Sequence, residues 1–507
     1  MSNFTEPETE DSQKSPRPNR LKNILFSRTT IAIGVPILVG VAAGAWWINR
    51  FIYEQLSPLV EKNLSQTLKR PIKVGRVERF GLTGLRLGAT SVPATPTDPD
   101  TASIEAVEVN FNPLSVLLTR TLPLDVTLVN PKAYVQQDTQ GRWVNTDIAT
   151  GGEGGPIQIA LNRLGWRNAQ AVLVSNVQQL TRSTPRNTVT LNQVNGEATF
   201  RENYNLIDFN LAGKPQTGGE LKLNGDFRAD SGRASININT QEFLASDLTR
   251  LIELPLVIQG GRVNSDFKAE LTPEKLLGLY GTADLNKVTA QVNELPQAFN
   301  NSQGRLQFKG TEIYLDNVAS SYGKIPAVAK GSLDIEKGFN LSAYVDAVSA
   351  AAAISSLKLQ VPVPVDGVFR SQVKLTGGLE TPILTGDVVN IKPVRLDRLN
   401  LSRTSTNFTL DVAAGTLNFP NIVATPAAGG KVTGNGTLKL ALQPEQTAGL
   451  NFNFIANNIP GDAIAKAYGV TNQAAKIGIV TAQAQVTGTP EKPRTVVNWQ
   501  APQATYP

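Results

Sequence analysis

The sequence predicts a mainly β protein, in which an N-terminal transmembrane helix precedes an elongated, curled antiparallel β-sheet that forms an open trough. Three observations predict this class. One uncharged segment near the N-terminus is long enough to cross a bilayer, apolar and polar residues alternate along most of the remaining chain, and a sequence unit recurs about every 105–111 residues. The length of 507 residues also favours a repeat array, because one compact core rarely grows that large.

The predicted anchor occupies residues 20–50 and follows a polar tail, residues 1–19, that is expected to be disordered. Residues 31–48 carry no charge, and at ~1.5 Å per residue they reach ~27 Å, about one hydrocarbon core. The ends of this span are marked by four residues, of which the tryptophans form an interfacial aromatic pair: Ile31, Trp46, Trp47 and Ile48.

Charge around the span predicts its orientation. Five Lys or Arg residues precede the span from residue 14 on, and two follow it up to residue 62. Because basic residues favour the cytoplasmic side, we expect a single-pass inner-membrane protein with a cytoplasmic N-terminus and a periplasmic bulk. A cleaved signal peptide, with residues 43–45 as the small-residue site, is the alternative.

A short amphipathic helix is expected over residues 51–70, ending near Pro71. Its apolar positions recur at helical spacing: Leu56, Leu59, Val60, Leu64 and Leu68. The helix either packs on the start of the sheet or rests on the outer leaflet of the membrane.

From residue 72 onward the hydrophobic period is 2, which indicates strands with one apolar and one wetted face. Turn residues separate these runs every eight to twelve positions. The apolar side of three such runs is the candidate lining of a groove: Leu221, Leu223, Phe227, Phe408, Leu410, Val412, Val432, Leu438, Leu440 and Leu442. A closed sandwich or barrel would bury the same faces, but the consistently polar opposite face and the scarcity of bulky anchors favour an open trough.

The repeat divides this region. Gly225, Gly331 and Gly436 lie in matching contexts, and each is followed by a helix-like patch, at 243–254, 348–359 and 461–470. The expected segments are an N-terminal β region at 71–155, repeats at 156–273, 274–382 and 383–493, and the start of a further repeat at 494–507. We therefore expect the chain to be either the N-terminal part of something longer or a truncated gene product.

Residues 127–148 hold a cluster of polar side chains that suggests a catalytic loop. Asp138 and Gly141 stand at the first and last positions of a good turn, so a hairpin is the better interpretation. Its arms would be 134–136 and 143–145, with Trp143 near the mouth of the trough.

Composition argues against catalysis. The chain has no His and no Cys, which removes the commonest general base, the commonest metal ligands and every thiol nucleophile. The glycine-rich residues 151–156 lack the Lys-Ser/Thr of a phosphate loop and fit a flexible connector. We therefore expect no enzyme, no cofactor and no metal site. The net charge of +6 is too small and too dispersed to predict nucleic-acid binding.

Residues 72–148 resemble the N-terminal region of TamB proteins, within the wider AsmA-like family of bridge-like lipid transfer proteins. The matching stretches are IKVGRVERFGLTGLRLGATSV, VEVNFNPLSVLLTRTLPLDVTLVNP and AYVQQDTQGRWVNTDI, and the later segments GGLETPILTGDV and GTPEKPRTVV are also similar. The pattern resembles the cyanobacterial branch and its chloroplast relative, an inner-envelope import component.

The resemblance implies a bridge anchored in the inner membrane that carries phospholipid along a hydrophobic β-groove across the periplasm toward the outer membrane. An alternative implied by the same family is an assembly factor for outer-membrane β-barrel proteins or protein translocation, with a BamA-like barrel partner. The family's domain that engages this partner is not among these 507 residues. A passive structural envelope protein is the third possibility.

Overall fold

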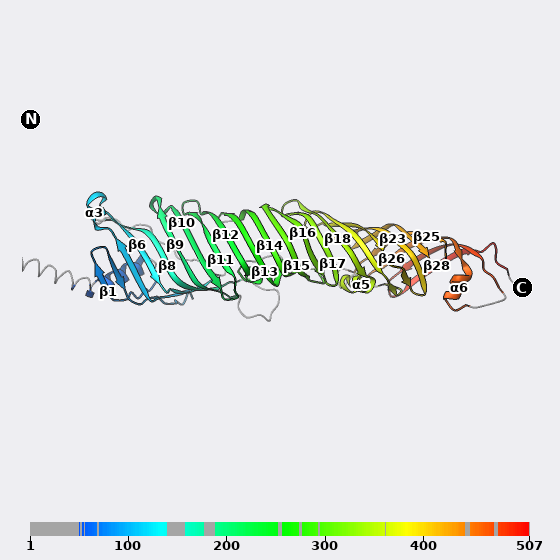
Figure 1. Ribbon diagram of the computed structural model, residues 1–507, viewed down its shortest axis with the longest axis horizontal. Helices are drawn as coiled ribbons and strands as arrows, with labels where there is room; N and C mark the ends of the chain where they lie inside the picture. The colour runs from blue at the N-terminus through cyan, green and yellow to red at the C-terminus, as the bar shows by residue number, and fades with distance from the viewer. Residues whose placement is uncertain are drawn as a thin grey trace, which may run out of the picture.

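The described residues of the protein form a long, open β-sheet of 28 strands with a few short helices (Figure 1). This computed structural model describes residues 50, 53–54, 56–67, 70–138, 158–176, 188–251, 256–272, 276–292, 295–359, 361–441, 447–470 and 475–505. The predicted mainly β class and the elongated open sheet are confirmed. The predicted transmembrane span, with Ile31, Trp46, Trp47 and Ile48, lies outside the described residues, and within them no helix is both long and apolar enough to cross a membrane.

The N-terminal end combines two helices with seven short strands. In chain order these elements are α2 (Leu56–Thr67), β1 (Val77–Gly81), β2 (Gly84–Leu87), β3 (Thr90–Val92), β4 (Thr101–Ile104), β5 (Ala106–Phe111), α3 (Pro113–Thr119), β6 (Thr121–Val129) and β7 (Lys132–Gln136). The strands β2, β5 and β6 are hydrogen-bonded side by side in that order. The strands β3, β4 and β7 form a second set of neighbours, placed end to end with the first set. Both sets pair with the long strand β8 (Gln158–Val174), the first through β6 and the second through β7.

The pairing with β8 corrects one expectation. Both β6 and β7 run parallel to β8, whereas the alternation predicts antiparallel strands. Within β7, Tyr134 pairs with Thr101 on β4 and with Val172 on β8. The predicted hairpin stays a prediction, because its second arm, residues 143–145, lies outside the described part of the chain together with Gly141 and Trp143.

From β8 onward the long strands pair antiparallel with their successors, as the alternation predicts. These strands are β9 (Thr188–Arg201), β10 (Leu206–Pro215), β11 (Glu220–Arg228), β12 (Arg233–Leu244), β13 (Leu256–Leu271), β14 (Leu276–Val292), β15 (Phe299–Gly310), β16 (Glu312–Tyr322), β17 (Ile325–Asp334), β18 (Gly338–Ser349), β20 (Val368–Gly377), β21 (Ile383–Asn390), β23 (Leu399–Asp411), β24 (Thr416–Pro426), β25 (Lys431–Lys439), β26 (Gly449–Pro460), β27 (Ile479–Gly488) and β28 (Pro493–Gln500). A 3-10 turn, η2 (Glu202–Tyr204), joins β9 to β10, and the short strands β19 (Val365–Asp366) and β22 (Val394–Leu396) pair with each other.

The repeat is visible as a unit of six long strands and one short helix. The strands that carry Gly225 and Gly331 are β11 and β17, and six long strands begin with each: β11–β16, then β17, β18, β20, β21, β23 and β24. A helix follows the second strand of each unit, and the three predicted helical patches are confirmed: α4 (Ser246–Leu251), α5 (Ala350–Leu357) and α6 (Gly461–Ala467).

The length of the sheet follows from its strand count. Five of the 28 strands, β3, β4, β7, β19 and β22, continue other strands end to end, which leaves 23 side by side. At ~4.8 Å between neighbours, 22 intervals span about 106 Å.

Candidate functional site

One face of the sheet carries a continuous apolar surface. We call the first of its two cross-strand series the N-terminal row. Its members face one another across successive strands from β2 to β20, and none is charged. They are Leu87, Val107, Leu128, Trp166, Gly196, Leu211, Leu223, Ile238, Phe267, Gly281, Phe308, Ile313, Leu333, Phe339 and Gly377.

A second series, the C-terminal row, runs two residues away on the same face and continues to β27. Its members are Leu221, Thr240, Ser265, Ala283, Leu306, Leu315, Gly331, Leu341, Leu375, Leu384, Leu410, Leu417, Leu438, Leu450 and Gly488. The two hydroxyls in this row, on Thr240 and Ser265, lie 2.8 Å apart and satisfy each other. Because the rows overlap from β11 to β20, together they make one uncharged path from β2 to β27.

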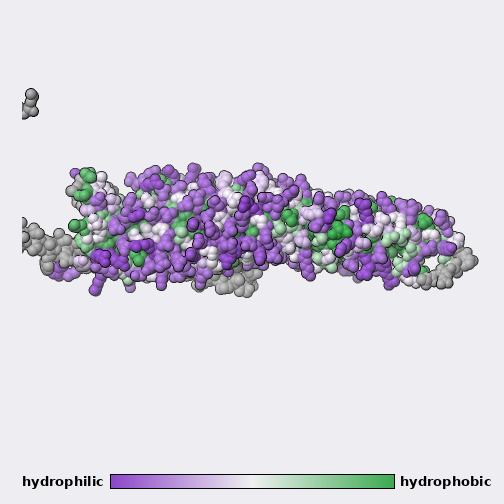
Figure 2. All heavy atoms as spheres, viewed as in Figure 1, coloured by the Kyte–Doolittle hydropathy of each residue, from purple (hydrophilic) through white to green (hydrophobic). Residues whose placement is uncertain are grey.

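The opposite face of the sheet carries polar side chains at the matching positions, with the exception of Ile383. One residue away from the C-terminal row, the facing residues are Lys222, Asn239, Asp266, Thr282, Gln307, Tyr314, Ser332, Asn340, Thr376, Ile383, Asp411, Thr416 and Lys439. A space-filling view shows a largely hydrophilic surface with hydrophobic residues gathered in patches (Figure 2).

Burial identifies the apolar face as the shielded one. Along β27 every residue from Ile479 to Gln485 alternates between exposed and half-buried, and the half-buried ones are Val480, Ala482 and Ala484. A flat single sheet would expose both faces equally, so the curl of the sheet shields the apolar face. The surface formed by the two rows is therefore a groove, and we refer to it as the apolar groove.

Glycines in the groove make room for aromatic rings. A Cβ atom at Gly436 would lie 2.3 Å from Cδ1 of Phe452, and one at Gly434 would lie 2.4 Å from Cδ1 of Phe454. Both rings come from the next strand, β26, and are parallel to each other, with centroids 6.0 Å apart. The repeat glycine Gly436 is thus required by the close approach of the Phe452 ring from the neighbouring strand.

Helix α2 covers the N-terminal end of the groove. Leu56 packs against the buried cluster of Val77, Leu87 and Val107, the last two of which begin the N-terminal row. Glu61 fixes the helix by accepting the backbone N–H of Val74 at 2.9 Å. Of the two predicted positions for this helix, packing on the start of the sheet is the one that the structure shows for Leu56.

The three repeat helices fold back along one rim, and α5 and α6 lie on the lower side in Figure 1. Asp247 of α4, 1% exposed, accepts hydrogen bonds from Thr217 in the β10–β11 turn at 2.5 Å and from Arg250 at 2.7 Å. The hydroxyl of Ser356 in α5 accepts the backbone N–H of Lys324 in the β16–β17 turn at 2.8 Å. Each of these helices is thereby tied to an earlier turn, which fixes the rim of the groove.

Helix α6 is held to the segment that follows it by the carboxylate of Asp462. Asp462 accepts the backbone N–H groups of Ile477 and Gly478 at 2.8 and 3.0 Å, and these hydrogen bonds lower the pKa of Asp462. Beyond the helix, the ring of Tyr468 lies 5.8 Å from the guanidinium of Arg398 in the β22–β23 turn.

Only some of the predicted lining residues lie in the apolar groove. Leu221, Leu223, Leu410 and Leu438 belong to the two rows, and Phe408 and Val432 share their face. Phe227 lies at the outer end of β11, and Val412 and Leu440 follow the ends of β23 and β25; Phe227 and Val412 are 36% and 37% exposed. Leu442 lies outside the described residues.

Sequence reasoning missed the N-terminal half of the groove. Trp166, Phe267 and Phe308 stand in runs of the same alternating kind, so the signal that found Leu221 would also have found them. Their joining into one row depends on strand register, which alternation leaves open.

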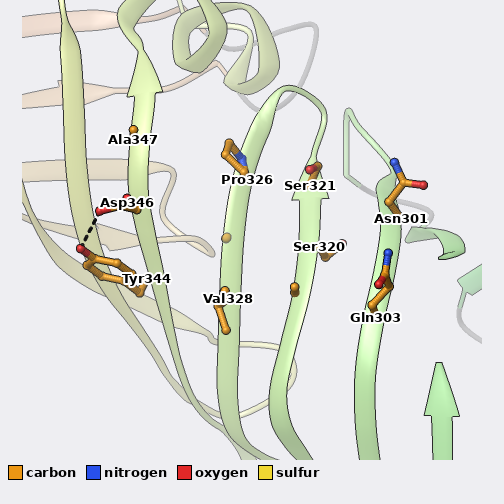
Figure 3. Close-up of a pocket in the computed structure, with 11 residues that line it drawn as sticks. Asn301, Gln303, Ser320, Ser321, Pro326, Val328, Tyr344, Asp346 and Ala347 are labelled. Carbon is orange, nitrogen blue, oxygen red and sulfur yellow. Dashed lines mark hydrogen bonds between the residues drawn. The ribbon is translucent and has the colours of Figure 1, made fainter. Parts of the chain in front are cut away.

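A small pocket on the polar face is the other candidate. It has a volume of about 320 Å³ and is lined by residues of β15–β18, including Gln303, Val328 and Tyr344 (Figure 3). Tyr344 donates a hydrogen bond to Asp346 at 3.0 Å, and Arg370 also binds Asp346 at 3.2 Å. Burial, and then the bond to Asp346, raises the pKa of Tyr344, so its hydroxyl stays protonated and is poorly suited to act as a base. Within the described residues there is no cluster of acidic side chains suited to a metal ion.

Comparisons with known proteins show distant sequence relatives. The chain is 23% identical over 362 residues to the chloroplastic protein TIC236 of Arabidopsis thaliana, and 21% identical over 357 residues to the chloroplastic protein SUBSTANDARD STARCH GRAIN 4 of Oryza sativa subsp. japonica. Each alignment covers 62% of this chain but only 16% and 17% of the relatives, so the chain spans about a sixth of their length. No family model matches the chain. No solved structure matches it either. At a coarse level the two relatives support the expected likeness to TamB-like and AsmA-like proteins.

Proposed function

We propose that this chain is part of a membrane-anchored bridge of the TamB type, akin to the cyanobacterial branch, and that it carries phospholipid along the apolar groove across the periplasm toward an outer membrane. The single observation that carries the proposal is the uncharged path of facing apolar residues from β2 to β27. Acyl chains gain ~0.8 kcal/mol for each buried methylene, whereas a soluble protein has no need of an apolar path of this length on one face.

The length of the groove also favours transport of lipid along it over the binding of a single lipid molecule. The sheet spans about 106 Å, several times the length of one lipid molecule, at ~4.8 Å per strand. Because the face opposite the groove is largely polar, the protein can cross an aqueous compartment while the groove carries acyl chains. The proposed anchor, residues 31–48, would hold the N-terminal end in the inner membrane.

Photocrosslinking tests this function. A photoreactive amino acid at Leu410 or Leu438 is expected to capture phospholipid in cells. The same amino acid at Thr409 or Lys439, one residue away on the opposite face, is the matched control and is expected to capture none. No lipid at Leu410 and Leu438, or equal capture on both faces, would overturn the proposal.

A further inference from the structure

Four apolar side chains project from the N-terminal end of the sheet, and we call them the apolar tip: Phe80, Leu82, Leu114 and Leu118. Leu82, in the β1–β2 turn, is 87% exposed, and Leu114 and Leu118, on α3, are 64% and 86% exposed. The two segments lie side by side, because the N–H of Phe111 just before α3 donates to the carbonyl of Thr83 at 2.9 Å. Helix α3 stands out from this end of the molecule (Figure 1).

The tip is not part of the folded core. Leu114 and Leu118 are four residues apart and therefore share one face of α3, and that face is open to solvent. The groove leucines on the neighbouring strands are buried or half-buried, as Leu87 and Leu85 show. Two separate chain segments thus present large apolar side chains at one place, which is typical of a surface that another phase or molecule covers.

We propose that the apolar tip inserts into the lipid surface of the membrane in which the chain is anchored. The first reason is charge. Arg79 stands next to Phe80, Arg120 stands two residues after Leu118, both are exposed, and neither has an ion-pair partner among the described residues. Leucines flanked by unpaired arginines fit a bilayer interface, where the apolar groups enter the acyl region and the cations meet anionic headgroups.

The second reason is distance, and it rests on the proposed function because it takes residues 31–48 as the anchor. Leu56, the first residue of α2, stands eight positions after the expected end of the span, Ile48. At ~3.5 Å per residue these eight steps reach at most about 28 Å. Leu56 packs on Val77 and Leu87, which pair at the ends of β1 and β2 away from the turn, and the five residue steps from Val77 to Leu82 add about 17 Å. The tip therefore stays within about 45 Å of the end of the span, and its insertion would bring the first strands of the groove toward the leaflet.

The absence of cysteine from the chain allows a direct test. Full-length Leu82→Cys and Leu118→Cys variants would be labelled with the environment-sensitive fluorophore NBD and reconstituted into vesicles of phosphatidylcholine with phosphatidylglycerol. The matched control is Asp230→Cys in the exposed β11–β12 turn, on the same rim but further along the sheet. We expect labels at 82 and 118 to emit at shorter wavelength and to be quenched at least several-fold more than the label at 230 by a spin label carried on lipid.

Three results would overturn the inference. Labels at 82 and 118 that emit as in water show that the tip stays in solvent. Labels protected from aqueous iodide but not quenched by the lipid-borne spin label show that protein covers the tip. A chain that does not float with the vesicles contradicts both the proposed membrane anchor and the proposed insertion of the tip. Flotation with solvent-exposed labels rejects the tip alone, and lipid crosslinking at Leu410 then reports on the groove independently.

Discussion

A charge in the middle of the apolar groove should interrupt the passage of lipid. Leu410 faces Leu384 on β21 and Leu417 on β24, so a chain that follows the C-terminal row must cross it. One strand interval of ~4.8 Å holds roughly four methylenes of an extended acyl chain. At ~0.8 kcal/mol for each buried methylene, Leu410→Glu should weaken lipid occupancy at this point by ~3.2 kcal/mol before the desolvation of the carboxylate is counted. This corresponds to about two-hundred-fold.

The assay for Leu410→Glu is phospholipid capture by a photocrosslinker at Leu438, two strands further along the same row. The control is Thr409→Glu, which puts the same charge on the opposite face, and circular dichroism during heating would verify that both variants keep the fold. We expect capture to fall steeply with Leu410→Glu and to stay near the parent value with Thr409→Glu. Equal capture in two folded variants would refute the assignment of the groove.

Three further predictions concern stability. Gly436→Ala should destabilise the sheet by about 1–3 kcal/mol, because its Cβ would overlap the ring of Phe452, and the double variant with Phe452→Ala should lose less than the two single effects combined; thermal unfolding measures both. Asp247→Ala should cost about 1–3 kcal/mol, since it removes the buried acceptor of Thr217, whereas Thr217→Ala should cost less; an unchanged unfolding midpoint for Asp247→Ala would contradict the role given to α4. Hydrogen bonds from backbone N–H groups lower the pKa of Asp462, so its stabilising effect is present above about pH 4 and is lost as the pH falls through the lowered value. The difference in unfolding midpoint between the parent and Asp462→Asn should therefore shrink from neutral pH to about pH 3, and a constant difference would argue against this assignment.

The sequence alone was sufficient to predict the two faces of the sheet and the repeat. Successive side chains of a strand point to opposite sides, so the alternation around Leu221 and Leu410 assigns a face without knowledge of the neighbouring strands. The helices after β12, β18 and β26 were also predictable, because their apolar spacing differs from that of the strands around them.

Only the tertiary structure decided which residues stand together. The row through Trp166, Gly196 and Leu211 depends on the register of three strands, and a bulge next to Trp166 shifts that register locally. The parallel course of β8 beside β6, and the folding of α4 back to Thr217, likewise join residues distant in sequence. Alternation is a local property with a period of two residues, whereas register, strand direction and curl arise from hydrogen bonds and packing between segments far apart in the chain, which leave no periodic trace within either segment.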